Sequence, residues 1–417
     1  MSKMLIEGAR KLSGEVEVQG AKNSALPILA ATILSGGENV LCNCANISDI
    51  DAAVGILRYL GGSVSRHHTT MLVNTDSLCR FDIPHDLMRE MRSSIVFLGA
   101  VLSRHKRARL SFPGGCELGP RPIDLHLKAL RQMGAVINEH HGILDCYAPK
   151  GLTGTKISLS FPSVGATENI LLAAVNAKGT TTLTNAAREP EIVDLAEYLN
   201  KCGAKIYGAG EGIIVVDGVG KLHGTQHTII PDRIVASTLL SCAAVTGSEI
   251  LLKGVISQHL SSVISIFEEA GCKVKADKGE ISFCAPERLN AVKNIRTMPY
   301  PGFPTDAQAP LMSALTVARG TSCFVENIFE SRFKHVGELL RLGANIKVEG
   351  KVAVVEGVSG LSGALVEAQD LRGAAALITA GLAAEGTTEV TGIKYLERGY
   401  DSFETVLSDL GASVRKV

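Results

Sequence analysis

A cysteine at position 116 lies in a segment whose composition suits chemistry. Two glycines precede it in the run Pro113-Gly114-Gly115-Cys116, and Gly119-Pro120 follows it. Pairs of glycine and proline interrupt helices and central strands, so the thiol is predicted to stand on a loop. Glu117 is its neighbour and Arg121 follows five residues later. Because structural cysteines are normally buried among apolar side chains, this polar and charged loop predicts a reactive thiol.

Six apolar segments of the chain each begin with polar or charged residues. These residues are Lys22-Asn23, Arg92-Ser93-Ser94, Thr167-Glu168-Asn169, Asp232-Arg233, Thr305-Asp306 and Asp370-Leu371-Arg372. Hydroxyls and carboxylates at a helix start are often simple caps, which is the interpretation we favour for Thr167 and Asp232. Lys22, Arg92 and Arg372 differ, because a cation at this end opposes the helix dipole. They predict an anionic ligand such as a phosphate or a carboxylate.

The elements that carry these residues recur along the chain. The apolar segments, at 25–34, 96–102, 169–177, 237–245, 310–317 and 374–384, have no polar face and predict helices buried on all sides. An amphipathic helix that ends in Leu-Gly-Ala, or a close variant, also occurs six times. Its glycines are Gly61, Gly134, Gly203, Gly271, Gly343 and Gly411. A glycine at this point predicts a helix cap that leads directly into a strand.

These repeats predict the architecture. Each repeat of about 70 residues holds one buried helix, one half-buried helix and several short strands. Since the helices lie inside, the sheets must lie outside. Six repeats divide naturally into two α/β domains of three, with the split expected near residues 218–231.

The composition limits the classes of function. Apolar residues make up 46% of the 417 residues, and 42 basic side chains balance 42 acidic ones. The zero net charge favours neither nucleic acid nor a membrane as a partner, and the basic run 104–109 is typical of a solvated turn. Ten cysteines without a disulfide framework or zinc spacing indicate reduced thiols. With no signal-peptide core and no membrane-length apolar stretch, we expect a cytoplasmic protein without a metal site.

Eight motifs in order make the chain resemble the UDP-N-acetylglucosamine 1-carboxyvinyltransferase family, the enoylpyruvyl transferases that open bacterial peptidoglycan synthesis. The resemblance covers essentially the whole chain. The motifs are Gly20-Ala21-Lys22-Asn23-Ser24-Ala25-Leu26, the Cys116 loop through His126, Phe161-Pro162-Ser163-Val164-Gly165-Ala166-Thr167-Glu168-Asn169, Pro231-Asp232-Arg233-Ile234, Pro301-Gly302-Phe303-Pro304-Thr305-Asp306, Glu330-Ser331-Arg332-Phe333, Asp370-Leu371-Arg372 and Glu397-Arg398-Gly399-Tyr400.

This resemblance implies a fold and a reaction. The fold is two inside-out α/β barrel-like domains, each of three βαβαββ units with buried helices. One domain is expected at 21–229 and the other at 1–20 plus 230–417, with the active site in the cleft between them. The reaction is transfer of the enolpyruvyl group of phosphoenolpyruvate to the 3'-hydroxyl of UDP-N-acetylglucosamine, through a tetrahedral ketal, with release of phosphate. It needs no cofactor and no metal.

The resemblance also implies which residues act. Cys116 matches the cysteine that protonates the vinyl carbon, forms an adduct with phosphoenolpyruvate and is alkylated by the antibiotic fosfomycin. Asp306 matches the base, or the carboxylate that orients the 3'-hydroxyl, and a helix cap is its alternative role. The residues matched to phosphoenolpyruvate are Lys22, Arg121 and Arg398, with Arg92 and Arg372 adding to the same positive field.

A further group is implied to bind the nucleotide sugar. It consists of Asn23, Arg121-Pro122-Ile123-Asp124-Leu125, His126, Ser163-Val164-Gly165 and Ile328, and Arg332 and Asp370 are implied to bind substrate as well. The Pro-Ile-Asp backbone suits the edge of uracil, and a Ser-Val-Gly turn that opens a helix suits a diphosphate. Capping of the following helix is the alternative for His126, and a structural bridge between two arginines is the alternative for Asp370.

Other functions stay open at this point. 5-Enolpyruvylshikimate-3-phosphate synthase shares the expected fold and phosphoenolpyruvate, but it lacks the Pro-Gly-Gly-Cys loop. A degenerate paralogue would bind the UDP-sugar and regulate without catalysis, although Lys22, Cys116, Asp306 and Arg398 are all present. RNA-terminal phosphate cyclases are built from related units, but the neutral charge speaks against nucleic acid. The sequence does not indicate an oligomeric state.

Overall fold

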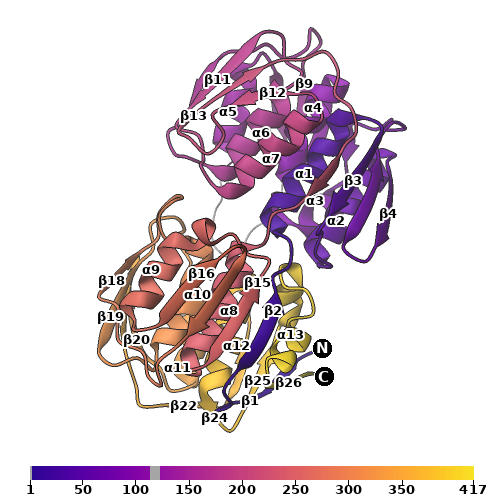
Figure 1. Cartoon of the computed structure of the whole chain (residues 1–417). Coiled ribbons are helices and arrows are strands. Elements are labelled where there is room, and N and C mark those ends of the chain that lie inside the picture. The colour runs from indigo at the N-terminus through magenta and orange to yellow at the C-terminus, as the bar shows by residue number, and fades with distance from the viewer. Residues whose placement is uncertain (1, 113–122) are drawn as a thin grey trace. The chain divides into compact units, whose positions relative to one another are not determined.

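The computed structural model describes residues 2–112 and 123–417, and the chain divides into two compact lobes (Figure 1). We call residues 20–112 with 123–230 the first lobe, and residues 2–19 with 231–417 the second lobe. Each lobe has its own cluster of buried apolar side chains. The lobes are therefore described one at a time.

Three apolar helices pack against one another in the first lobe: α1 (Lys22–Ser35), α4 (Phe97–His105) and α6 (Val164–Ala174). Every residue of α1 except Asn23 is buried. The predicted helix at 96–102 is preceded by a 3-10 turn, η1 (Arg92–Val96). Helices without a polar face need cover on all sides, and here they are covered by further helices and by sheets.

Amphipathic helices surround this centre. They are α2 (Ser48–Leu60), α5 (Asp124–Gln132) and α7 (Pro190–Lys201), with the short α3 (His85–Glu90) beside them. The glycines that follow the three long ones, Gly61, Gly134 and Gly203, have φ angles of 107°, 94° and 99°. These values lie in the left-handed region that glycine adopts without strain, so the predicted helix caps are confirmed here.

The first lobe has three four-stranded sheets, each with one parallel and two antiparallel pairings. The first sheet, in spatial order, is β14 (Gln226–Thr228), β3 (Glu38–Cys42), β5 (Thr70–Asn74) and β4 (Ser63–His67). The second is β6 (Asp82–Ile83), β7 (Arg107–Ser111), β9 (Ile143–Tyr147) and β8 (Val136–His140). The third is β10 (Lys156–Ser158), β11 (Thr180–Thr184), β13 (Ile213–Asp217) and β12 (Lys205–Tyr207).

The second lobe is built in the same way around its own three packed apolar helices. These helices are α8 (Arg233–Val245), α10 (Thr305–Leu315) and α12 (Leu371–Ala383). The outer helices are α9 (Ser261–Glu269), α11 (Val336–Arg341) and α13 (Phe403–Asp409), with 3-10 turns η2 (Ser257–Leu260) and η3 (Ile393–Arg398). Gly271, Gly343 and Gly411 follow the outer helices with φ angles of 98°, 92° and 94°.

The N-terminal strands complete sheets of the second lobe, because β2 pairs with β15 and β1 pairs with β25 and β26. One sheet is β16 (Lys273–Asp277), β17 (Glu280–Cys284), β15 (Glu249–Lys253) and β2 (Ser13–Glu17). The next is β18 (Asn294–Arg296), β19 (Thr321–Val325), β21 (Val352–Glu356) and β20 (Asn345–Glu349). The last is β23 (Leu365–Glu367), β25 (Thr387–Thr391), β1 (Met4–Glu7) and β26 (Ser413–Lys416), and β22 (Leu361–Ser362) pairs with β24 (Ala384–Glu385).

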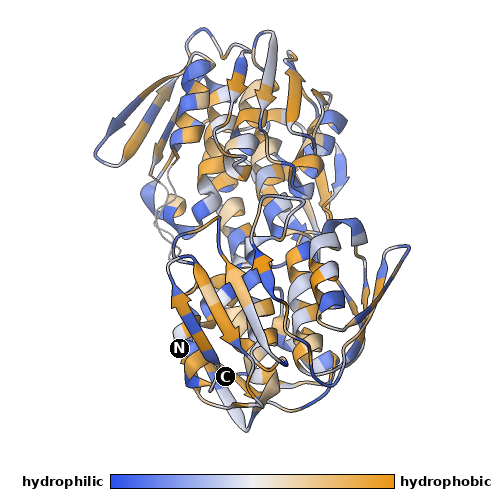
Figure 2. Cartoon of the chain, turned by 90° about the vertical axis from the view of Figure 1, so that its left-hand side faces the viewer, coloured by the Kyte–Doolittle hydropathy of each residue, from blue (hydrophilic) through white to orange (hydrophobic). Residues whose placement is uncertain are grey.

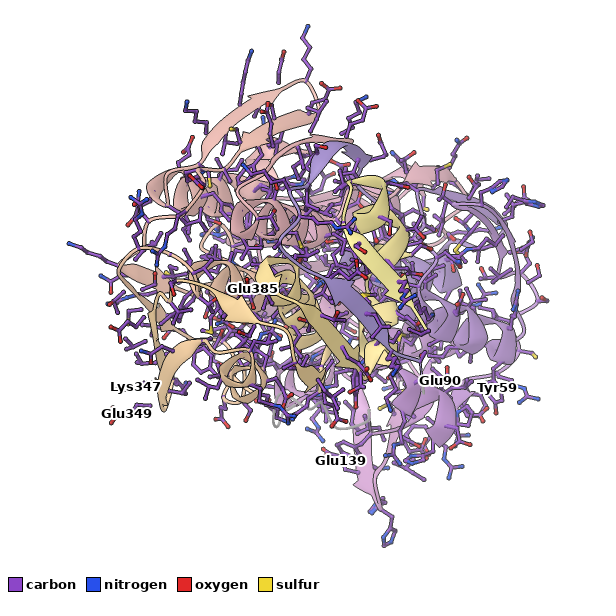
Figure 3. The ribbon with its side chains drawn as sticks, turned by 90° about the horizontal axis from the view of Figure 1, so that it is seen from below. Tyr59, Glu90, Glu139, Lys347, Glu349 and Glu385 are labelled. Carbon is purple, nitrogen blue, oxygen red and sulfur yellow. The ribbon has the colours of Figure 1, made fainter. Side chains whose placement is uncertain are left out.

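Alternation along the strands places one face of each sheet on the helices. Buried and less buried residues alternate in β3, β11, β15 and β19. Figure 2 shows that the strands of the chain contain both apolar and polar residues. Glu139 on β8 and Lys347 and Glu349 on β20 are exposed and extend away from the body of the chain (Figure 3). The helices are thus inside and the polar strand faces outside within each lobe.

Two helix caps test the sequence-based interpretation. Asp232 caps α8 as expected, since its carboxylate accepts from the backbone N–H groups of Ile234 and Val235 at 2.8 and 3.0 Å. Thr167 is not a cap, because α6 begins at Val164, five residues before the apolar segment 169–177, and is capped by Ser163, which accepts from Ala166 N at 3.3 Å. Among the described residues, no helix combines the length and the apolar character needed to cross a membrane.

Candidate active site

The first turn of α1 presents Lys22 beside a buried carboxylate. Lys22 Nζ lies 3.0 Å from Oδ2 of Asp49, in the first turn of α2, and the two side chains are only 10% and 2% exposed. A Cβ at Gly20 would overlap the backbone oxygen of Asn43, so only glycine fits where the chain enters α1. The cation that opposes the helix dipole therefore has a protein anion beside it, which the sequence-based argument for a ligand anion had overlooked.

A second group in the first lobe joins α5 to the start of α6. His126 is 6% exposed, and its Nδ1 lies 2.8 Å from the amide nitrogen of Asn169 on α6. A Cβ at Gly165 would lie 3.2 Å from Cε1 of this ring, so the imidazole packs on the first turn of α6. The structure therefore brings His126 together with Gly165, in the turn that Ser163 and Val164 open. The capping role considered for His126 is wrong, because α5 begins after Ile123 without a side-chain cap and α6 is capped by Ser163.

Positive charge and burial keep His126 neutral. Burial first, and then the charge of Arg92 at the start of η1, lower the pKa of His126 to about 4, while Asp124 acts weakly in the opposite direction. At neutral pH the ring therefore has one N–H donor and one acceptor. Ile123 is buried just before α5, whereas Asp124 is exposed and Leu125 is half-buried in its first turn.

In the second lobe, Asp306 bridges two buried arginines. Its Oδ1 lies 2.7 Å from Nη2 of Arg332, and its Oδ2 lies 2.9 Å from Nη2 of Arg372. The arginine side chains are 2% and 4% exposed, whereas Asp306 is 28% exposed. Since α10 begins after Pro304 without a side-chain cap, the capping role considered for Asp306 is wrong. The carboxylate is held in place with part of its surface open.

Arg372 continues this network towards α8. Its Nη1 donates to the hydroxyl of Tyr400 at 3.1 Å, and that hydroxyl lies 2.8 Å from Oγ1 of Thr238. Burial alone would lower the pKa of Arg372, but the charge of Asp306, followed by that of Tyr400, raises it overall. Arg372 is therefore a permanently charged group in a fixed position.

Glu326, which follows β19, connects Asp306 with the loop that carries Ile328. The carboxylate is 1% exposed. It accepts from the N–H groups of Ile328 and Phe329 at 2.8 and 3.0 Å, and from Oγ1 of Thr305 at 2.9 Å. Thr297 donates to it as well, at 2.9 Å. Nothing in the sequence marks this glutamate, because it follows an ordinary alternating strand.

Two further predicted residues, Asp370 and Arg398, lie in the second lobe. Asp370 caps α12, since it accepts from the N–H groups of Arg372 and Gly373 at 3.0 and 2.9 Å. The bridge between two arginines that the sequence suggested for Asp370 is therefore wrong, and Asp306 makes that bridge. Arg398 ends η3 and is half-buried.

Comparison with known proteins identifies the family. The sequence model of the family described as EPSP synthase (3-phosphoshikimate 1-carboxyvinyltransferase) matches residues 6–407. The chain belongs to this family of carboxyvinyltransferases. Within the family it is similar to UDP-N-acetylglucosamine 1-carboxyvinyltransferase 2 of Caldanaerobacter subterraneus, with 50% identity over all of both chains. It is 48% identical to UDP-N-acetylglucosamine 1-carboxyvinyltransferase 1 of Symbiobacterium thermophilum, over 99% of this chain and 95% of that one.

A third relative and two solved structures agree. UDP-N-acetylglucosamine 1-carboxyvinyltransferase of Trichlorobacter lovleyi is 46% identical over 100% of this chain and 99% of its own. The enolpyruvyl transferase NikO from Streptomyces tendae superposes with a TM-score of 0.89 at 26% identity, covering 100% and 99% of the two chains. EPSP synthase from Acinetobacter baumannii gives 0.75 at 20% identity over the full length of both, which supports the fold alone. The predicted α/β fold of an enolpyruvyl transferase is confirmed.

The described site residues thus form one group in each lobe. Lys22, Asn23, Arg92, Ile123, Asp124, Leu125, His126, Ser163, Val164 and Gly165 belong to the first lobe, and Asp306, Ile328, Arg332, Asp370, Arg372 and Arg398 belong to the second. Cys116, Arg121 and Pro122 lie outside the described residues.

The sequence-based reasoning missed Asp49 and Glu326 and gave no role to Asn169. In the described part of the chain, no cluster of three or more His, Cys, Asp or Glu side chains is placed to hold a metal ion.

Proposed function

We propose that this chain transfers the enolpyruvyl group of phosphoenolpyruvate to the 3'-hydroxyl of UDP-N-acetylglucosamine and releases phosphate. The observation that carries the proposal is 46–50% identity, over essentially the full length, to three relatives with the corresponding name. The reaction would be the first committed step of peptidoglycan synthesis in a bacterial cytoplasm. The two site groups support it, because each offers fixed cations for anionic substrates.

The chemistry is an addition followed by an elimination. In the addition, the sugar oxygen bonds to C2 of phosphoenolpyruvate, its proton leaves to a base, and C3 gains a proton to become a methyl group. In the elimination, the methyl group loses a proton and the C2–O bond to phosphate breaks. A thiol at Cys116 is the proposed acid at C3. Lys22, Arg121 and Arg398 are proposed to hold the carboxylate and phosphate of the reagent, with Arg92 and Arg372 adding positive charge.

Asp306 is proposed to receive the sugar hydroxyl. Each of its oxygens already accepts from one guanidinium, and an ionised carboxylate has further lone pairs available. The fixed geometry favours orientation of the 3'-hydroxyl, with proton acceptance as the O–C2 bond forms. Arg332 and Glu326 would then act by holding Asp306 and Ile328 in position.

The nucleotide sugar is proposed to bind the remaining residues. The first turn of α6, with Ser163, Val164 and Gly165, offers backbone N–H groups to the diphosphate. His126 lies against that turn and adds a side-chain donor. The proposed remaining contacts are Asn23, Arg121, Pro122, Ile123, Asp124, Leu125 and Ile328, and Asp370 is proposed to bind substrate as well.

We also propose that the two lobes are the domains expected at 21–229 and at 1–20 plus 230–417. Six βαβαββ repeats in two inside-out barrels are the proposed architecture. Its support is that each four-stranded sheet among the described residues has the same pattern, with one parallel pair next to two antiparallel pairs.

Phosphate release from phosphoenolpyruvate tests the function. We expect release with UDP-N-acetylglucosamine, inhibition after treatment with fosfomycin by alkylation of Cys116, and loss of release in Cys116→Ser. Release with shikimate 3-phosphate instead would identify a 5-enolpyruvylshikimate-3-phosphate synthase. Tight binding of the UDP-sugar without any release would identify a non-catalytic, regulatory protein.

A further inference from the structure

The orientation of the Asn169 amide is set by the backbone around it. Its oxygen accepts from the N–H of Gly99 at 2.7 Å, and its nitrogen donates to the carbonyl of Ile95 at 3.0 Å. A flipped amide would place two donors together at Gly99 and two acceptors together at Ile95. The amide group that faces Nδ1 of His126 at 2.8 Å is therefore the nitrogen.

This orientation decides which nitrogen of His126 has the proton. An amide nitrogen has two hydrogens and accepts none, so one hydrogen goes to Ile95 and the other to the imidazole. Nδ1 of His126 must then be the acceptor, and in a neutral ring the proton is on Nε2. Within residues 2–112 and 123–417, the charged groups that act on the ring are Arg92 on η1 and Asp124 on α5.

The Nε2 atom lies beside the first turn of α6. It is 3.5 Å from the position of a Cβ on Gly165, and no hydrogen bond of Nε2 is present among the described residues. The first N–H groups of an α-helix have no partner within the helix and attract anions. An Nε2–H donor adds to that field, whereas a bare Nε2 would turn a lone pair towards the anion.

We propose that Asn169 is a positioning residue that holds His126 as the Nε2–H tautomer, so that the ring donates to an anionic oxygen of the nucleotide sugar at the start of α6. This inference rests on the proposed function for the identity of the ligand, but the tautomer itself does not. Asn169 is fully buried and acts only through His126.

The tautomer can be read directly in the unliganded wild-type protein. In ¹⁵N-labelled protein, two-bond N–H correlations distinguish protonated from bare ring nitrogens, and His126→Gln assigns the signals. We expect a protonated Nε2 and a bare Nδ1 at neutral pH, with the Nε2–H signal shifted when UDP-N-acetylglucosamine is added. A protonated Nδ1 in the wild type, or an Nε2–H that is unaffected by bound UDP-sugar, would overturn the proposal.

Asn169→Asp replaces the amide nitrogen that faces His126 with an oxygen, while the other oxygen still accepts from the N–H of Gly99. The carboxylate must accept from His126, so the proton is expected on Nδ1. At a pH at which the spectra show a neutral ring, we expect about ten- to hundredfold weaker binding of UDP-N-acetylglucosamine by calorimetry, the range for a hydrogen bond to a charged group. The KM for phosphoenolpyruvate is expected to change little.

Asn39→Asp is the matched control. Asn39 is also fully buried in the first lobe, with its amide nitrogen on Ser35 Oγ at 3.0 Å and its oxygen on Tyr198 at 2.7 Å. It tests the general effect of a buried carboxylate, and we expect UDP-sugar binding to be unchanged. Equal loss in both variants would show that Asn169 has a merely structural role.

A double-mutant cycle separates positioning from stability. A glutamine at position 126 has no tautomers, so in the His126→Gln background Asn169→Asp is expected to weaken binding by about twofold or less. An undiminished loss there would contradict the inference. If the wild type failed to bind UDP-N-acetylglucosamine at all, the proposed function would fail, while the tautomer of the free protein would still show whether Asn169 controls the ring.

Discussion

Lys22 and Asp49 form an ion pair that is almost fully buried. Removal of one charge therefore leaves the other buried without its full balancing charge. In Asp49→Asn we expect a loss of about 3 kcal/mol in the free energy of unfolding, measured with urea. Because Lys22 would move, the KM for phosphoenolpyruvate is expected to rise as well. Asp51→Asn is the control, since Asp51 lies on the same helix with a 67% exposed side chain. Equal effects of the two variants would contradict the role of Asp49.

For Asp306, we expect a substitution to lower kcat, which reports the transition state, more than it changes the binding of the substrates. Asp306→Asn keeps the shape but removes the charge that is proposed to accept the sugar proton, so we expect kcat to fall by about 10²- to 10⁴-fold. Steady-state assays with both substrates measure this change, and circular dichroism checks the fold. Asp409→Asn, an exposed carboxylate of the same lobe, should leave kcat unaltered. A fall in kcat of less than tenfold for Asp306→Asn would contradict its proposed catalytic role.

At the scale of elements, Glu326 fastens the start of α10 to the loop after β19. Glu326→Ala leaves four donors without their acceptor, and we expect a loss of about 3 kcal/mol in urea unfolding together with lower activity. Glu326→Gln keeps one carbonyl oxygen in place, and the Thr305 hydroxyl can turn to accept from the new amide. It should therefore retain most of the stability. If both variants lost equal stability, the hydrogen bonds would not be the cause.

The backbone requirement at a helix end can be tested by comparing a glycine after α11 with a glycine inside it. Gly343 follows α11 with a φ of 92°, and no described atom lies within 4 Å of an added Cβ. Gly343→Ala is thus expected to cost about 1 kcal/mol through backbone strain alone. Gly337 lies inside α11, again with open space, so Gly337→Ala should stabilise by about 0.5–1 kcal/mol. Thermal and urea unfolding measure both, and the opposite signs are the test.

At the scale of the whole molecule, two buried histidines make stability depend on pH. Burial lowers the pKa of His335 to about 4; the charge of Asp370 opposes this shift, and the weaker effect of the Arg332 charge adds to it. The pKa of His126 is also about 4. The unfolded chain binds these protons below about pH 6.5, while the folded chain resists them down to about pH 4. The stability that the two neutral histidines contribute is thus fully present above pH 6.5 and is lost as the pH falls towards 4.

In that interval, each histidine adds at most about 1.4 kcal/mol per pH unit to the slope of the unfolding free energy against pH. We expect His126→Gln and His335→Gln each to flatten the fall in unfolding free energy between pH 6.5 and 4, measured by urea titration at a series of pH values. His140→Gln, at an exposed position on β8, is the control and should leave the slope unchanged. An unchanged slope in both buried variants would show that carboxylates alone cause the loss.

The sequence by itself determined the apolar helices, their glycine-capped amphipathic neighbours and the family. These features are local: hydrophobic periodicity, left-handed glycines and short motifs can be read within a few residues. The sequence also predicted a reactive loop at Cys116 and an anionic ligand at the cations of the helix starts, because these residue types suit anionic substrates.

Only the tertiary structure decided which groups meet. Lys22 and Asp49 are 27 positions apart, His126 and Asn169 are 43 apart, and Asp306 and Arg372 are 66 apart. A buried polar group finds its partner through packing between elements, and that packing leaves no trace in either local segment. For this reason Asp306, and not Asp370, bridges the arginines, and Asn169 selects the donor of His126.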